Sequence, residues 1–146
     1  MTRPNAVSTA VERVRASFGK QRLMATLGAR LEDVGAGKVT IRLPFSDALA
    51  QQHGFLHAGA IAAVADSACG YAALSLMPPD AAVLSIEFKV NMLSPAKGDV
   101  IARAEVIRPG RNIMVCRADV RSVPEEKLIA AMQGTMMVVR GGDLSD

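Results

Sequence analysis

The sequence predicts an α+β fold in which an antiparallel sheet packs around one long central helix. Residues 57–77 are small or apolar apart from the charge of Asp66 in the middle of the run. Before this run, residues 7–27 repeat apolar side chains at helical spacing, and after it residues 81–140 alternate apolar and polar side chains. These patterns fit an N-terminal helical segment, one long central helix and a set of strands packed around it.

The composition is that of an ordinary globular domain. The chain has 146 residues, of which 50% are hydrophobic and 21% charged, so one domain can bury a core of useful size. The formal net charge of +3 forms no basic block with interleaved aromatic residues, which argues against nucleic-acid binding. Cys69 and Cys116 lie in apolar runs and are predicted to be free buried thiols.

The first element is a helical segment over residues 7–27. Its apolar side chains recur at steps of three or four residues, and Gly19 is expected to divide it into two helices. The segment has charges at short intervals and lacks the apolar core of a signal peptide, so we expect a cytoplasmic protein. Residues 28–45 then predict two short strands joined at Gly35–Gly37, because apolar and polar residues alternate in KVTIRLPF.

A long predicted strand follows the sequence PPD, which ends the central helix. Its alternation is expected to place Leu84, Ile86, Phe88 and Val90 on one face and Ser85, Glu87, Lys89 and Asn91 on the other. Residues 94–99 predict a turn, residues 100–122 a hairpin about Pro109–Gly110, and residues 125–140 the last strand. Four strands joined by turns thus follow the central helix.

Residues 57–77 are long enough to be weighed as a membrane span, but a span is rejected. Ala and Gly insert poorly, and an ionised Asp66 near the centre adds roughly 2.5–3.5 kcal/mol on insertion scales. A helix that is apolar on nearly all sides is better explained as one wrapped by the rest of a folded protein. Its small side chains allow a curved sheet to approach closely.

A buried carboxylate without hydrogen-bond donors is strongly disfavoured, so Asp66 needs an explanation. In one interpretation it is structural and is bonded to a nearby hydroxyl such as that of Ser67 or Ser85. In the other it faces a cavity or a subunit boundary that water and ligand reach. The surrounding sequence, QQHGFLHAGAIAAVAD, favours the second interpretation.

If the central helix begins near Ala58, its first backbone N–H groups lack intrahelical partners and lie at the positive end of the helix dipole. Such groups can hold a developing oxyanion, and the amide of Gln51 can orient water or a carbonyl. Asp66 lies about 12 Å further along the helix. The two groups can share a ligand only if a second, antiparallel copy of the helix lies nearby, which predicts a site between subunits.

Two stretches, QQHGFLHAGAIAAVAD and LSIEFKVNMLSPAKGDVIARAEVIRPGRN, resemble motifs of the hotdog-fold acyl-CoA thioesterases. The resemblance is to the phenylacetate-pathway thioesterase type (PaaI-like) and its 4-hydroxybenzoyl-CoA thioesterase relatives. It covers residues 28–139, the predicted hotdog core, and leaves residues 1–27 as an N-terminal helical segment of one domain spanning residues 1–146. It implies a curved antiparallel sheet of about six strands around a long helix, assembled as a homodimer and often as a homotetramer.

The same resemblance implies the catalytic residues. Asp66 matches the family's catalytic carboxylate, which acts as general base on water or as nucleophile. Ala58 matches the residue whose backbone N–H polarises the thioester carbonyl, Gln51 the residue that positions water or substrate, and Ser85 a hydroxyl that orients the water. The family usually has Gly at the position of Ala58, and a left-handed backbone there would not tolerate Ala easily.

The substrate-binding residues implied by the resemblance lie in the same segments. They are His57, Gly59, Lys89, Ser94, Lys97, Arg108, Gly110, Arg111 and Asn112. The four Lys and Arg residues among them suit the phosphates of coenzyme A as a group, whereas each taken singly also fits a solvated strand or turn. His57 either contacts the thioester or anchors the loop, and anchoring is favoured.

The sequence thus leads to a hypothesis: hydrolysis of an acyl-CoA thioester to a carboxylic acid and free coenzyme A, which is part of the substrate. No metal or redox cofactor is expected, because His53 and His57 lack carboxylate-rich neighbours. Ser67 has no His at a spacing typical of a Ser-His-Asp triad. Two alternatives stay open: a non-catalytic acyl-CoA binding protein on the same fold, and a hotdog hydratase or dehydratase.

Overall fold

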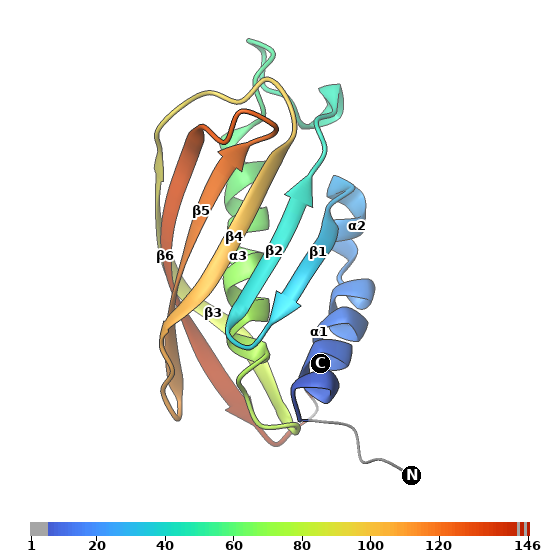
Figure 1. Ribbon diagram of the computed structural model, residues 1–146, viewed down its shortest axis with the longest axis vertical. Helices are drawn as coiled ribbons and strands as arrows, with labels where there is room; N and C mark the ends of the chain where they lie inside the picture. Colours follow the sequence, from blue (N-terminus) through green and yellow to red (C-terminus); the bar gives the residue numbers. More distant parts are fainter. Residues whose placement is uncertain (1–5, 143, 145) are drawn as a thin grey trace.

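The computed structural model describes residues 6–142, 144 and 146, and shows a six-stranded antiparallel sheet curved around one long helix (Figure 1). The strand order is β1-β2-β4-β5-β6-β3. The elements are α1 Ala6–Lys20, α2 Arg22–Leu27, β1 Arg30–Gly35, β2 Lys38–Leu43, the 3₁₀ turn η1 Asp47–Leu49, α3 Ala58–Leu74, β3 Ala81–Met92, β4 Val100–Arg108, β5 Ile113–Ser122 and β6 Leu128–Arg140. The predicted α+β fold is confirmed; residues 1–5 of the predicted N-terminal segment lie outside the described residues.

Helix α3 occupies the concave side of the sheet, as its small side chains predict. Ala65, Ala68 and Ala72 are fully buried, and the helix contacts every strand from β2 to β6. The small alanine side chains at these positions let the inward-facing residues of the strands close on the helix. Cys69 and Cys116 are free and buried in this core, as predicted. Among the described residues, no helix is long and apolar enough to cross a membrane.

The N-terminal segment forms two helices, as predicted, but the break does not fall at Gly19. Helix α1 continues through Gly19 to Lys20, and the interruption falls at Gln21, whose backbone is extended (φ −77°, ψ 104°). The Gln21 side chain accepts a hydrogen bond from Ser67 and donates one to Tyr71, both on α3. We attribute the break to these tertiary contacts, which hold Gln21 against α3 instead of in a continuous helix.

Strand β3 lies at the far edge of the sheet from β1, where it pairs with β6. Residues 94–99, predicted as a turn, therefore do not form a hairpin but carry the chain across the end of the sheet to β4. The other edge of β3 pairs with no described strand. A long strand is thus left with a free edge.

The predicted faces of β3 hold from Glu87 onward but are wrong for Leu84 and Ser85, because the strand contains a β-bulge. Ser85 pairs with Met136 but Glu87 pairs with Thr135, so Ile86 is the extra residue. Paired residues share a face of the sheet, and the bulge therefore puts Ser85 on the concave face together with Phe88. Leu84, Glu87 and Lys89 share the convex face instead. Ser85 consequently points toward α3.

The C-terminal end of α3 is held by Arg13 of helix α1. Its guanidinium donates hydrogen bonds to the backbone carbonyls of Leu74, Met77 (3.0 Å) and Pro78 (2.6 Å). The last carbonyls of a helix lack intrahelical donors and favour a nearby cation. One side chain therefore fixes both the end of α3 and the position of α1.

Replacing Arg13 by Met should destabilise the fold by about 1–3 kcal/mol, because partly buried carbonyls lose a charged donor while the apolar stem is kept. Urea unfolding at neutral pH measures this. Arg15→Met, which removes an exposed charge from the same helix, is the matched control and should change stability by less than about 0.5 kcal/mol. Equal losses in the two variants would contradict the capping role.

Candidate active site

Asp66 lies on α3 and is joined to β3 by a hydrogen bond from Ser85 Oγ to Asp66 Oδ1 of 2.7 Å. Of the two hydroxyls considered from the sequence, Ser85 is thus its partner, whereas Ser67 donates to Gln21. Burial raises the pKa of Asp66 above its ordinary value, and the bond from Ser85 opposes that rise. Asp66 Oδ2 has no donor among the described residues. One carboxylate oxygen therefore remains available for chemistry.

The carboxylate is not sealed in the core. A cavity of about 120 Å³ opens beside it. Its lining residues are Gln21, Asp66, Ser67, Gly70, Tyr71, Val83, Ser85 and Asp146. A volume of this size admits water or a compact group of a ligand.

The start of α3 lies at Ala58, as predicted, and His57 caps it. The backbone of His57 is extended (φ −65°, ψ 137°), and its ring Nδ1 accepts a hydrogen bond of 2.8 Å from Gly59 N–H. A Cβ on Gly59 would lie 3.0 Å from that Nδ1, which explains glycine at this position. Ala58 N–H has no acceptor within the part of the chain that the structure describes. One free N–H thus remains at the positive end of the helix.

Gln51 begins the loop that leads into α3. Its backbone closes a turn by accepting from Gly54 N–H (2.9 Å), and Gly54 has the positive φ of +82° that favours glycine. Its side-chain Oε1 accepts from His53 N–H. The Gln51 NH₂ group has no acceptor among the described residues and is free to donate.

Gln51 and Ala58 line one larger cavity of about 410 Å³. Its walls are Gln51, Gln52, Phe55, Leu56, His57, Ala58, Ile61 and residues 92–96, which include Ser94. Asp66 and Ser85 are not among them. The structure therefore brings the predicted catalytic residues together in two pairs, and helix geometry separates Ala58 from Asp66 by about 12 Å in one chain.

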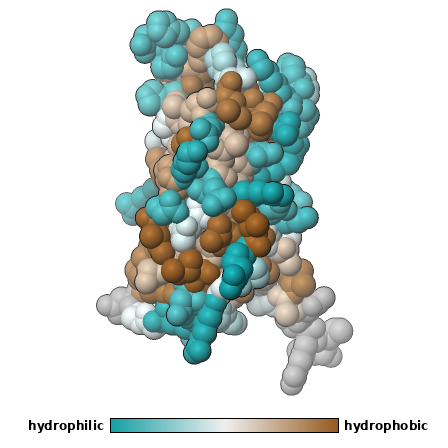
Figure 2. Space-filling view, turned by 90° about the vertical axis from the view of Figure 1, so that its left-hand side faces the viewer, coloured by the Kyte–Doolittle hydropathy of each residue, from teal (hydrophilic) through white to brown (hydrophobic). Residues whose placement is uncertain are grey.

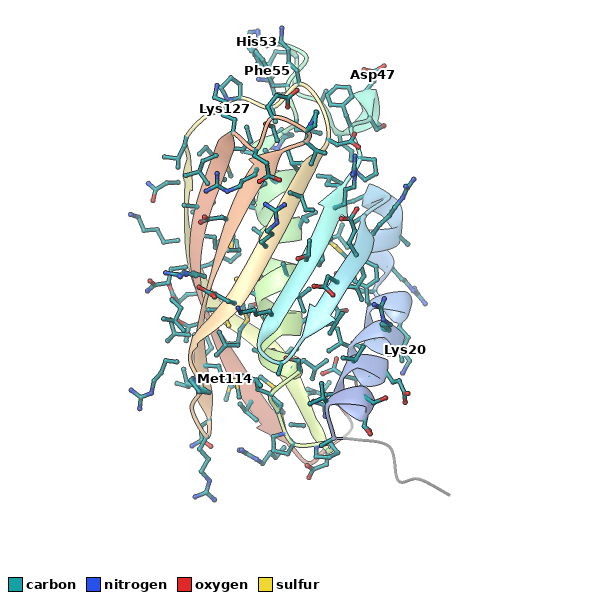
Figure 3. The ribbon with its side chains drawn as sticks, viewed as in Figure 1. Lys20, Asp47, His53, Phe55, Met114 and Lys127 are labelled. Atoms are coloured by element: carbon teal, nitrogen blue, oxygen red, sulfur yellow. The ribbon has the colours of Figure 1, made fainter. Side chains whose placement is uncertain are left out.

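The predicted phosphate-binding cations are spread over the molecule. Lys97 lies over the ring of Phe55, with its Nζ 5.1 Å from the centroid, and Figure 3 places Phe55 and His53 at the tip of the molecule. Lys89 lies on the convex face of the sheet. Arg108 ends β4. One chain does not gather these cations around a single point.

The turn between β4 and β5 has its own structural requirements. A Cβ on Gly110 would clash with the carbonyl oxygen of Ile113. The backbone oxygen of Arg111 and the side-chain oxygen of Asn112 accept hydrogen bonds from Arg140. These contacts explain Gly110 and Asn112 without a ligand, so a role in binding substrate stays a prediction.

Sequence reasoning missed five residues that line the cavity beside Asp66: Gln21, Gly70, Tyr71, Val83 and Asp146. Gly70 follows Asp66 by four residues on the same helix, so its approach could be found from helical spacing. Gln21 and Asp146 come from distant parts of the chain, and local periodicity carries no signal for them. Among the described residues, no three His, Cys, Asp or Glu side chains gather in a way that could hold a metal.

A model of the thioesterase superfamily matches residues 53–129, more than half of the chain and the part that carries Ala58, Asp66 and Ser85. The chain belongs to the thioesterase superfamily. The resemblance and the hotdog fold predicted from the sequence are therefore confirmed, and the protein is an enzyme of the thioester hydrolase type. A 1,4-dihydroxy-2-naphthoyl-CoA hydrolase of Listeria monocytogenes is 30% identical over 117 residues, which cover 80% of this chain and 94% of that protein.

Solved structures of thioesterases share the whole architecture. A thioesterase family protein from Silicibacter pomeroyi is 48% identical with a TM-score of 0.88, and the match covers 90% of this chain and 99% of that one. A thioesterase from Haemophilus influenzae is 26% identical with a TM-score of 0.80, over 88% and 90%. The PaaI protein of E. coli, at 19% identity and a TM-score of 0.86 over 94% and 98%, shows the same fold.

The alanine at position 58 is compatible with the thioesterase fold of this chain. Ala58 is the first residue of α3, and Glu126 is the one non-glycine residue with positive φ in the described ranges. The left-handed conformation that would exclude Ala is therefore not adopted here. A methyl group at this position leaves the N–H in place.

Replacing Asp66 by Asn should raise the stability of the protein at pH 7. Burial raises the pKa of Asp66 in the folded state. The group's contribution to stability is therefore fully present at pH values below its unfolded pKa. That contribution is lost as the pH rises through its folded pKa. Asn does not ionise and escapes that loss. The gain in free energy of unfolding should vanish as the pH falls to the ordinary pKa of 3.8 and below.

Urea unfolding of both proteins at a series of pH values measures the difference. Glu125→Gln, which removes one exposed acid elsewhere, is the control for the loss of a single charge. A variant Asp66→Asn that is less stable than the unmodified protein at pH 7 would mean that the carboxylate stabilises the fold and is structural.

Proposed function

We propose that this protein hydrolyses an acyl-CoA thioester to a carboxylic acid and free coenzyme A at a site shared by two copies of the chain. The observation that carries the proposal is the separation of two complementary groups on α3. The free N–H of Ala58 can hold an oxyanion, and the free oxygen of Asp66 can act as base or nucleophile. Since one chain holds them about 12 Å apart, one reaction centre needs Ala58 and Asp66 from different copies.

The free edge of β3 supports such an assembly. Five apolar residues on or next to this strand have between 41% and 53% of their surface exposed: Leu84, Ile86, Phe88, Met92 and Leu93. Figure 2 faces the side of the sheet where β3 and β6 run and shows apolar surface there. A long, exposed apolar edge strand is a template for pairing with another strand. We infer that two β3 edges pair in a homodimer, which can pair again as a homotetramer.

The direction of pairing brings the two halves of the site together. When two copies of β3 pair antiparallel, the end with Ser85 in one copy turns toward the end with Met92 in the other. Met92 lines the same cavity as Ala58 and Gln51, and Ser85 is bonded to Asp66. The Ala58 N–H of the second copy therefore approaches the Asp66 of the first.

In the proposed reaction, the thioester carbonyl oxygen accepts a hydrogen bond from Ala58 N–H, which stabilises the negative charge that develops on it. Asp66 takes a proton from water as the water oxygen attacks the carbonyl carbon, or attacks that carbon itself to give an anhydride that water then cleaves. In either course the C–S bond breaks and the thiolate of coenzyme A takes a proton. Ser85 orients Asp66, and the free NH₂ group of Gln51 positions water or carbonyl.

The larger cavity suits the coenzyme A arm better than the smaller one. It measures about 410 Å³ and opens at residues 92–96, next to Lys97. Ser94 and Lys97 are therefore the predicted binding residues best placed to contact that arm. His57 serves as the helix cap, which agrees with its favoured role as an anchor of the loop. The scheme needs no metal or redox cofactor.

A hydratase or dehydratase activity is less well supported than hydrolysis. Such chemistry needs a histidine that exchanges protons with the substrate, and the Nδ1 of His57 is already bonded to Gly59 N–H. Figure 3 places His53 at the tip of the molecule, and His53 does not line the cavity beside Asp66. A non-catalytic acyl-CoA binding protein stays the main alternative, and the next experiment separates it from an enzyme.

Thiol release from a panel of acyl-CoA thioesters tests the function. The wild-type protein should release coenzyme A, and Asp66→Asn and Ala58→Pro should each lower kcat at least about a hundredfold. Proline removes the N–H of Ala58 but suits the first position of a helix and the extended backbone of His57 before it. Ala58→Gly keeps the N–H and is the matched control with near wild-type activity.

Binding of a non-hydrolysable acyl-CoA without thiol release from any member of the panel would support the non-catalytic alternative. Near wild-type turnover by Asp66→Asn would exclude the carboxylate as base or nucleophile. Near wild-type turnover by Ala58→Pro would place the oxyanion donor elsewhere.

Phe88→Asp should dissociate the assembly, because it places a charge in the middle of the exposed edge strand. In the paired dimer, this carboxylate would also lie close to the same carboxylate of the second copy. Light scattering after size exclusion should show the mass fall to that of a monomer, with loss of thioester hydrolysis. Gln133→Asp adds the same charge to β6, which is not an edge strand, and should leave the mass unchanged. A Phe88→Asp variant that keeps both the wild-type mass and activity would contradict pairing through β3.

A further inference from the structure

The cavity beside Asp66 has a polar wall that comes from the N-terminal helices. Gln21, at the junction of α1 and α2, donates a hydrogen bond from Nε2 to the hydroxyl of Tyr71 (3.0 Å) and accepts one at Oε1 from Ser67 (3.0 Å). Tyr71 is buried and packs against the ring of Phe18, with centroids 5.8 Å apart. The amide of Gln21 is thus held in one orientation at the wall of the cavity.

Gln21 keeps hydrogen-bonding capacity for a ligand. An amide NH₂ group has two donors and its oxygen two lone pairs, and the contacts to Tyr71 and Ser67 use one of each. Within the described residues, no further partner of this side chain is present. One N–H and one lone pair remain beside the cavity that contains Asp66.

Gly70 leaves the space of the cavity open. It lies one helical turn after Asp66 on the same face of α3 and lines the same cavity. A Cβ at Gly70 would meet no atom within 4 Å, and the backbone there is helical. A larger side chain would therefore fit sterically and would occupy space next to the carboxylate. Helical geometry does not require glycine at this position.

We propose that Gly70 and Gln21 select the acyl group, admitting compact acyl groups that carry a hydrogen-bonding atom beyond the thioester. This inference rests on the proposed thioester hydrolysis. The cavity of about 410 Å³ is the larger and suits the long coenzyme A arm, which leaves the cavity of about 120 Å³ beside Asp66 for the acyl group. Gly70 sets the size of this cavity, and Gln21 supplies its hydrogen-bonding groups. Ser67 and Tyr71 hold the side-chain amide of Gln21 in place.

The size of the acyl group is tested with Gly70→Val and with acetyl-CoA and butyryl-CoA as substrates. The valine side chain takes the space of the longer acyl group, so kcat/KM for butyryl-CoA should fall at least about tenfold relative to acetyl-CoA. Ala63→Val, on the same helix but lining a different cavity, should leave the ratio unchanged. Gly70→Ala, which favours the helix, should raise the melting temperature while moving the ratio in the same direction.

The polarity of the acyl group is tested with Gln21→Leu and with 3-hydroxybutyryl-CoA and butyryl-CoA. Leucine has a similar size but no donor or acceptor, so the preference for the hydroxylated substrate should fall at least about tenfold. Gln133→Leu, an exposed glutamine on β6, is the matched control. The pH profile of kcat/KM should not move in Gln21→Leu, because the bond between Ser85 and Asp66 is kept.

The outcomes separate this inference from the function on which it rests. If the wild-type protein hydrolyses none of the thioesters, both fall together. If it hydrolyses them but Gly70→Val and Gln21→Leu change kcat/KM equally for all substrates, or leave it unchanged, the selection of the acyl group is overturned and the hydrolysis stands.

Discussion

The hydrogen bond between Ser85 and Asp66 holds a carboxylate between the central helix and the edge strand, where burial raises its pKa. Helix α3 is otherwise small and apolar because the curved sheet must close around it. An acid in such a helix opposes folding when ionised, and this penalty is a typical property of catalytic groups. The bulge at Ile86 turns Ser85 toward the helix, where its hydroxyl donates to the buried carboxylate and partly offsets the cost of burying it.

The two groups of the proposed reaction, the Ala58 N–H and the Asp66 carboxylate, lie on the same helix. His57 caps its start and leaves one free N–H at Ala58, and Asp66 follows more than two turns later. A straight helix cannot bring these groups together, and the free edge of β3 offers the surface through which a second copy can. In the proposed assembly, the strand that pairs the copies also carries the serine that orients the acid.

Local patterns predicted the order of the elements, the start of α3 at Ala58 and the position of Asp66, because helix ends and periodicity depend on neighbouring residues. They failed where contacts with distant segments of the chain determine the local structure. The bulge at Ile86 depends on pairing with β6, and the break at Gln21 depends on contacts with α3. The place of Gln21 in the cavity wall depends on that break, so the sequence pattern did not predict it either.

The most direct test of a shared site is a mixed dimer of Asp66→Asn and Ala58→Pro chains, coexpressed with different tags and isolated. Each homodimer should be inactive, whereas the mixed dimer contains one intact site and should regain about half of the wild-type kcat per dimer. A mixed dimer as inactive as its parents would show that both groups act within one chain, and would contradict the account.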